Sequence, residues 1–220
     1  MALLEVKNLT KHFGGLTAVG DVTLELNEGE LVGLIGPNGA GKTTLFNLLT
    51  GVYEPSEGTV TLDGYLLNGK QPYKIAALGL GRTFQNIRLF KDLTVLDNVL
   101  IAFSNHHKQH VFASFLRLPA FYKNEKELKA KALELLKIFD LDGDAETLAK
   151  NLAYGQQRRL EIVRALATEP KILFLDEPAA GMNPQETAEL TELIRRIKDE
   201  FKITIMLIEH DMNLVMEVTE

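Results

Sequence analysis

The sequence predicts an α/β fold with parallel strands, and two observations predict it. A glycine-rich loop, Gly36–Thr44, directly follows the apolar run Leu31–Ile35. A later apolar run, Ile172–Leu175, ends in the adjacent carboxylates Asp176 and Glu177. Short apolar runs of this kind are typical of buried parallel strands, and such sheets bind their ligands beyond the carboxyl ends of the strands. We therefore expect a functional site at this edge of the sheet.

The loop after the first of these strands has the spacing G-x-x-x-x-G-K-[ST]. Its glycines let backbone N–H groups surround phosphate oxygens, and the following helix directs its positive end at the same anion. We predict that Lys42 contacts the β- and γ-phosphates and that Thr43 ligates Mg²⁺. A packing role for the loop would leave the lysine and the paired threonines unexplained. The candidate nucleotide-binding residues are Gly36, Pro37, Asn38, Gly39, Ala40, Gly41, Lys42, Thr43 and Thr44.

Composition narrows the class of protein. The 220 residues are 45% hydrophobic and 25% charged, which is ordinary for a globular protein, and the net charge of −6 does not predict a nucleic-acid partner. The absence of cysteine excludes disulfides and thiolate metal sites. Neither a signal peptide nor a membrane-spanning apolar run is evident, so we expect a cytosolic chain that reaches a membrane only through a partner.

The N-terminal part predicts an antiparallel β-subdomain. Residues 3–9 and 22–26 alternate apolar with polar side chains, as half-exposed strands do, and residues 58–62 predict another strand. Between the first two strands we place Phe13 in a turn, residues 11–15. A loop aromatic upstream of a phosphate loop could stack on a nucleotide base or simply pack, and the pattern alone leaves both open.

The middle of the chain predicts an inserted helical subdomain. A short strand within residues 79–84 ends at Gln85, and the sequence is helical in character from Thr94 to about Ala167. An amphipathic stripe in this region consists of Leu128, Ala132, Leu135, Leu136 and Phe139. We therefore expect a nucleotide-binding core of residues 1–85 and 168–220 and a helical subdomain of residues 86–167.

Two segments of the middle region have no assigned role. Residues 105–110 hold three of the five histidines, and without cysteines or paired acids nearby a solvated loop is favoured over a metal site. Residues 111–119 are unusually apolar for a loop and either pack on the subdomain or contact a partner.

The C-terminal part predicts the catalytic groups. We expect Asp176 to hold Mg²⁺ through water and Glu177 to polarise the attacking water as a general base. After a helix over residues 184–200, the buried strand 203–208 leads to His210, which could reach a phosphate or cap the strand end. The chain stops within an expected helix, so we expect its C-terminal end to be cut short.

These motifs, in this order, resemble the ATP-binding cassette (ABC) ATPase family over essentially the whole chain. The resemblance implies a P-loop NTPase (RecA-like) core with a mixed sheet, an antiparallel β-subdomain and an inserted helical subdomain. It implies that the chain binds ATP and Mg²⁺ and that Phe13 stacks on the adenine base. It also implies that Gln85 links Mg²⁺ and the attacking water to a membrane partner, and that His210 contacts the γ-phosphate. Residues 152–156 stand where the family has Leu-Ser-Gly-Gly-Gln, with Ala153 and Tyr154 departing and Gly155 and Gln156 retained.

The resemblance also implies partners. In the family this signature loop faces the ATP of an opposite subunit, so Ala153, Tyr154, Gly155 and Gln156 are candidate nucleotide contacts. Residues 151–162 and 176–186 resemble the ATPases of branched-chain amino acid importers. This implies transmembrane permeases, a second ATPase as hetero- or homodimer, a periplasmic or extracellular solute-binding protein reached indirectly, and a peripheral place on the cytoplasmic face of the membrane.

Several alternatives remain at this point. Urea, amide and other amino acid importers carry similar ATPases. An ABC ATPase that acts on ribosomes or DNA usually has two cassettes or long coiled-coil insertions, and neither is present. An unrelated P-loop kinase or GTPase would leave residues 151–159 and His210 unexplained, and the guanine-reading Asn-Lys-x-Asp is absent.

Overall fold

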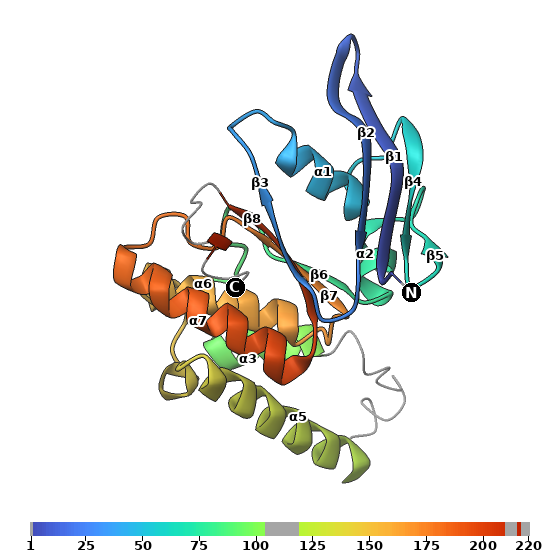
Figure 1. Cartoon of the computed structure of the whole chain (residues 1–220). Coiled ribbons are helices and arrows are strands. Elements are labelled where there is room, and N and C mark those ends of the chain that lie inside the picture. Colours follow the sequence, from blue (N-terminus) through green and yellow to red (C-terminus); the bar gives the residue numbers. More distant parts are fainter. Residues whose placement is uncertain (1, 104–118, 210–214, 217–220) are drawn as a thin grey trace. The chain divides into compact units, whose positions relative to one another are not determined.

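A computed structural model describes residues 2–103, 119–209 and 215–216 (Figure 1). The chain divides into two compact units, one of Met1–Gln85 with Pro170–Glu220 and one of Asn86–Glu169. His210, the histidine-containing segment 105–110 and residues 111–118 lie outside the described residues. Each unit is described by itself below.

The first unit contains an antiparallel sheet with the strand order β2-β1-β4-β5. Its strands are β1 (Leu4–Phe13), β2 (Leu16–Leu26), β4 (Glu57–Leu62) and β5 (Tyr65–Leu66). The antiparallel prediction is confirmed, but β1 and β2 are longer than predicted. Phe13 is the last residue of β1, opposite Leu16 in the register, so its predicted place in a turn is wrong. Cross-strand pairing extends the hairpin further than apolar alternation reveals.

The first unit also contains a parallel sheet with the order β3-β8-β7-β6. Its strands are β3 (Leu31–Ile35), β8 (Thr204–Glu209), β7 (Ile172–Asp176) and β6 (Leu80–Arg82). All five residues of β7 and all six of β8 are buried, as their apolar runs predict. In contrast, β3 is only partly buried, because among the described strands it pairs with β8 alone and forms a sheet edge. The prediction of a buried β3 is therefore wrong.

This unit also contains the helices α1 (Lys42–Leu49), α2 (Pro72–Ala77) and α7 (Pro184–Phe201). Helix α1 joins the two sheets, because its apolar side chains share one core cluster with residues of β1, β4, β7 and β8. Phe46 of α1 stacks on Phe174 of β7 with 4.8 Å between ring centroids. Helix α7 begins with a capping box between Asn183 and Glu186, the arrangement that satisfies two backbone N–H groups at a helix start.

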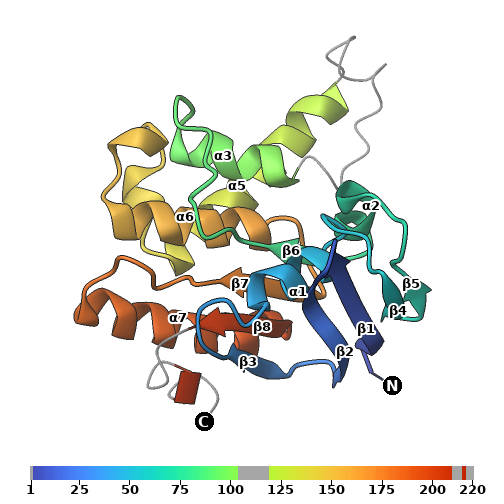
Figure 2. The same cartoon turned by 90° about the horizontal axis from the view of Figure 1, so that it is seen from above.

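The second unit is helical, and Figure 2 shows its helices side by side. They are α3 (Val95–Phe103), α5 (Pro119–Ile138), α6 (Tyr154–Leu166) and two 3₁₀ turns, η1 (Asp142–Asp144) and η2 (Ala149–Asn151). The predicted stripe is confirmed, because all five side chains are buried; four of them lie in α5, and Phe139 directly follows the helix. Among the described helices, none is both long enough and apolar enough to cross a membrane.

Candidate nucleotide-binding site

The phosphate loop links β3 to α1 in the first unit. Gly41 caps α1 with φ +86°, and a Cβ there would stand 2.3 Å from the carbonyl oxygen of Ala18. Only glycine fits this backbone conformation and this close approach. Lys42 is 8% exposed, and its Nζ donates to the carbonyl oxygens of Gly36 at 2.5 Å and Pro37 at 2.9 Å. The ammonium therefore lies over the loop, where it can form an ion pair with a bound phosphate group.

One cavity of about 840 Å³ brings together most of the predicted residues of this unit, whereas Gly36, Pro37 and Asp176 do not line it. It is lined by Phe13, Leu16, Thr17, Ala18, Asn38, Gly39, Ala40, Gly41, Lys42, Thr43, Thr44, Gln85 and Glu177. The lining combines one exposed aromatic ring, one lysine, several hydroxyls and one carboxylate. Such a surface can receive a planar base at Phe13 and a polyphosphate at the loop.

The aromatic end of this cavity has a partner that the sequence did not reveal. Phe13 is 43% exposed, and Tyr53 meets it edge to face with 5.3 Å between ring centroids. The ammonium of Lys11 lies 5.2 Å from the Phe13 centroid and donates to the carbonyl oxygen of Glu54. The exposed ring is thus fixed from two sides, which favours stacking on a base over loose packing.

The polar end of the cavity holds the two groups predicted to handle water. Gln85 Nε2 donates to Glu177 Oε2 at 2.7 Å, although the two residues are 92 positions apart. Glu177 follows β7 with φ +48°, a left-handed conformation that costs about 1–3 kcal/mol for such a residue. The Glu177 N–H donates to the carbonyl oxygen of Ile208 at 3.0 Å, which fixes the chain in this turn.

Asp176 lies at the end of β7 and is held by a residue absent from the predicted site. Its side chain is 3% exposed, and Arg82 Nη2 contacts Asp176 Oδ2 at 3.0 Å. The same guanidinium donates to Asn47 Oδ1 of α1 at 2.7 Å and to Oγ1 of Thr50, the C-cap of that helix, at 2.9 Å. It also lies 4.9 Å from the Phe84 ring centroid.

Arg82 therefore ties the helix behind the phosphate loop to the carboxylate of β7. Its side chain is only 8% exposed, and its Nε is buried without a hydrogen-bond partner among the described residues. An arginine within the predicted short strand 79–84 was the signal that could have indicated this role, because arginines that become buried need a partner.

The residues at the signature position open α6 in the second unit. Ala153 is the N-cap and its methyl group cannot accept a hydrogen bond, but Gln156 Oε1 accepts from the Ala153 N–H at 3.1 Å. Gln156 Nε2 also donates to Asp144 Oδ2 at 2.8 Å. The Gln156 side chain is thus engaged within its own unit, whereas the N–H groups of the first turn of α6 remain able to face an anion.

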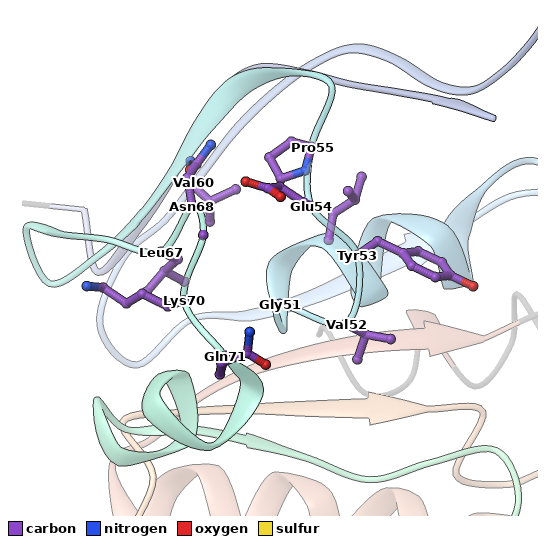
Figure 3. Close-up of a pocket in the computed structure, with 12 residues that line it drawn as sticks. Gly51, Val52, Tyr53, Glu54, Pro55, Val60, Leu67, Asn68, Lys70 and Gln71 are labelled. Atoms are coloured by element: carbon purple, nitrogen blue, oxygen red, sulfur yellow. Dashed lines mark hydrogen bonds between the residues drawn. The ribbon is translucent and has the colours of Figure 1, made fainter. Parts of the chain in front are cut away.

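A smaller hollow of about 220 Å³ lies at the end of α1 (Figure 3). Its wall includes Tyr53, Glu54, Leu67, Asn68 and Gln71. The Asn68 side-chain amide forms two hydrogen bonds with the backbone of β4: it accepts from the Val60 N–H and donates to the Gly58 carbonyl oxygen. This hollow contains none of the predicted site residues, so the larger cavity is the candidate site.

The larger cavity and β7 offer ligands suited to Mg²⁺. Thr43 contributes a hydroxyl, Gln85 an amide oxygen and Asp176 a carboxylate, the hard oxygen donors that this cation prefers. Among the described residues, no group of three or more histidine, cysteine or acidic side chains could hold a metal by itself. A magnesium ion brought by a polyphosphate, which supplies further oxygens, fits this donor set.

Comparison with known proteins agrees with this geometry. Residues 19–180 match the model of the ABC transporter family. Two curated relatives are high-affinity branched-chain amino acid transport ATP-binding proteins. LivG of Salmonella typhimurium is 51% identical and BraF of Pseudomonas aeruginosa 49% identical, each over 218 residues that cover 99% of this chain and 86% of the relative.

A solved structure has the same fold over nearly the whole chain. It is the ADP conformation of an ATP-binding cassette of an ABC transporter, with a TM-score of 0.84 and 33% identity. The match covers 99% of this chain and 85% of the other. Shared sequence and shared fold therefore extend far beyond the phosphate loop.

Proposed function

This chain belongs to the ABC transporter family, and we propose that it is the ATP-binding and ATP-hydrolysing subunit of an importer for branched-chain amino acids. The observation that carries the chemistry is the larger cavity, which is lined both by Lys42 of the phosphate loop and by the hydrogen-bonded pair Gln85 and Glu177. The solute is supported by relatives of about 50% identity over 99% of the chain, whose names state branched-chain amino acid transport.

ATP binding uses the two ends of the cavity. The adenine base stacks on Phe13, whose ring is oriented by Tyr53 and Lys11. The phosphates lie in the loop Gly36–Thr44, whose N–H groups and helix end favour anions, and Lys42 turns its ammonium from the loop carbonyls to the phosphates. Asp176, Thr43 and Gln85 are the residues that would hold Mg²⁺, which supplies charge neutralisation on the phosphates when bound.

Hydrolysis uses the polar end. Glu177 accepts a proton from the attacking water, and its hydrogen bond with Gln85 keeps the carboxylate oriented. Phosphoryl transfer depends mainly on positioning and charge, so the rigid turn at Glu177 and the lysine do most of what the protein contributes. We assign His210 to the γ-phosphate by its place in the family order of motifs.

Transport requires a second subunit and a membrane partner. We propose that Ala153, Tyr154, Gly155 and Gln156 face the ATP of an opposite ATPase, homologous or identical, and that ATP binding closes the pair. The segment after Gln85, residues 86–90, contacts transmembrane permeases, which places the chain peripherally on the cytoplasmic face of the membrane. A solute-binding protein acts on the far side and reaches this chain only through the permeases.

The alternatives are an ATPase of a related importer, for urea, amides or other amino acids, and a non-transport ABC ATPase. Each keeps the cavity and its chemistry and changes only the partners or the solute. The high identity to two transport proteins of one solute class favours the branched-chain assignment.

The test is to tag the full chain in its native cell, solubilise the membranes gently and identify what co-purifies. We expect two polytopic permeases and a second ATPase, and ATP-dependent uptake of leucine, isoleucine or valine by vesicles that contain the recovered complex. Uptake of urea or an amide instead would replace the solute. Recovery of ribosomes or DNA would overturn the transport assignment and leave the ATPase standing.

A further inference from the structure

The tyrosine at the signature position makes a specific contact within its own helix. Tyr154 is the first residue of α6 and is 45% exposed. Its hydroxyl accepts from Arg158 Nη2 at 3.1 Å, and the Arg158 guanidinium carbon lies 5.5 Å from the Tyr154 ring centroid. A glycine at this position could make neither contact, so the departure from the family pattern creates a link that starts at the signature loop.

The link continues through a buried ion pair. Arg158 and Glu161 have side-chain exposures of 3% and 6%, and Arg158 Nη1 lies 3.4 Å from Glu161 Oε2. Removing one partner of such a pair leaves an uncompensated charge in the interior, so the two side chains are constrained to move together.

The other oxygen of the carboxylate reaches the segment that follows Gln85. Glu161 Oε1 accepts from the backbone N–H of Arg88 at 3.2 Å. Arg164, one turn further along α6, donates to the Arg88 carbonyl oxygen, and its guanidinium lies 4.7 Å from the centroid of the Phe90 ring. Burial lowers the pKa of Arg164, while Glu161 opposes that shift.

Helix α3 holds the same segment from its other end. Asn98 is fully buried; its Oδ1 accepts from the Phe90 N–H and its Nδ2 donates to the Phe90 carbonyl oxygen, both at 3.0 Å. The backbone of residues 88–90 is therefore fixed by side chains of two helices, whereas the side chains of Arg88 and Phe90 are exposed.

We propose that Tyr154, Arg158 and Glu161 form a relay that transmits the position of the signature loop to the backbone of residues 88–90. This inference rests on the proposed function, in which the signature loop faces the ATP of the opposite subunit and residues 86–90 face a permease. A nucleotide that displaces the Tyr154 hydroxyl or ring changes what Arg158 can contact, and Glu161 passes the change to the Arg88 N–H. The three residues are positioning residues for coupling, and the chemistry of hydrolysis belongs to the other unit.

Hydrogen exchange tests the relay directly. The parent protein is the full Glu177→Gln chain with its co-purified partners, which is expected to bind ATP without turning it over. We expect ATP to change amide exchange in the segment 86–90 of the parent by at least about threefold. Tyr154→Phe removes only the hydroxyl and should abolish most of this change. The matched control is Tyr65→Phe, a 58% exposed tyrosine of β5 in the other unit, which should behave as the parent.

Each outcome of the exchange experiment decides a different point. An ATP effect in the parent that Tyr154→Phe leaves unaltered would overturn the relay and leave the proposed function intact. No ATP effect on residues 86–90 in the parent would overturn the relay together with ATP-driven closure.

The amount of solute transported per ATP hydrolysed provides a second test, because a purely structural role of these residues would not change this ratio. In vesicles with the recovered complex, we expect Glu161→Gln to lower the solute transported per ATP at least about threefold, with the melting temperature recorded in parallel. Combining it with Tyr154→Phe should cause little further loss, because groups of one network are not additive. Fully additive losses, or a fall in melting temperature with an unchanged transport ratio, would contradict the relay.

Discussion

The two segments proposed to contact phosphate are built in opposite ways. The loop before α1 presents backbone N–H groups, and its fit depends on the absence of a side chain at Gly41. The segment that opens α6 depends on side chains, because Tyr154, Arg158 and Glu161 form a chain of contacts behind it. A backbone site tolerates little change at its glycines, whereas a side-chain site can exchange residues and acquire new connections. In this chain the phosphate loop has the family spacing, whereas the segment that opens α6 departs from the family pattern at Ala153 and Tyr154.

The most severe way to test the comparison is Gly41→Ala. The methyl group would meet the Ala18 carbonyl oxygen at 2.3 Å in a left-handed backbone, so the loop must shift. We expect ATP affinity, measured by titration calorimetry, to fall more than about tenfold. The control is Gly29→Ala, with φ +76° and open space, which should lose about 1–2 kcal/mol of stability and keep ATP binding. Equal ATP affinity in both variants would contradict the backbone model.

Glu177→Gln separates binding from chemistry in the same cavity. The amide keeps the shape and the contact region of Gln85 but cannot take a proton from water, so we expect turnover to fall about 100-fold or more while ATP binding persists. Phosphate release and nucleotide titration measure the two effects. Glu192→Gln, at an exposed position of α7, serves as control. Normal turnover in Glu177→Gln would remove the base assignment.

Arg82→Met tests whether the unit that carries the phosphate loop also depends on a buried charge. Without the guanidinium, Asp176 is left buried without its cationic partner, and we expect the free energy of unfolding in urea to fall by about 3–5 kcal/mol. Arg82→Lys keeps the charge but loses the fork that reaches Asn47 and Thr50, so its loss should be smaller. A change below about 1 kcal/mol in Arg82→Met would show that the pair contributes nothing to stability.

The smallest effect is expected for Ala153→Ser, which restores the serine typical of the family. Unlike the variants above, it should raise the stability of the protein. Ala153 has the extended backbone of an N-cap but no side-chain acceptor. A serine there should stabilise α6 by about 1 kcal/mol, seen as a higher melting temperature, because it satisfies an N–H of the first turn. A loss of stability would mean that the alanine is required by packing.

The sequence predicted the groups whose role depends on spacing. The phosphate loop, the two carboxylates at the end of β7 and the buried stripe of residues 128–139 each follow a local pattern, and the structure places them where the patterns predict. The hydrogen bond between Gln85 and Glu177 joins distant positions and was not predicted; the order of motifs only assigned both residues to the attacking water.

The sequence did not predict the contacts that depend on three-dimensional packing. Tyr53 and the link from Tyr154 to Arg88 were not predicted, because contacts between separate elements leave no local pattern. Arg82 was visible as a charge in a short strand, but its partner Asp176, 94 positions away, was not. The edge position of β3 was missed for the same reason, since an apolar run does not reveal how many neighbours a strand has.

The backbone of Glu177 has a consequence for how this protein can evolve. A residue with φ +48° is one that glycine would occupy at lower energy, so Glu177→Gly should make the fold more stable while removing the proposed base. Selection for stability alone and selection for ATP turnover would therefore act on this position in opposite directions.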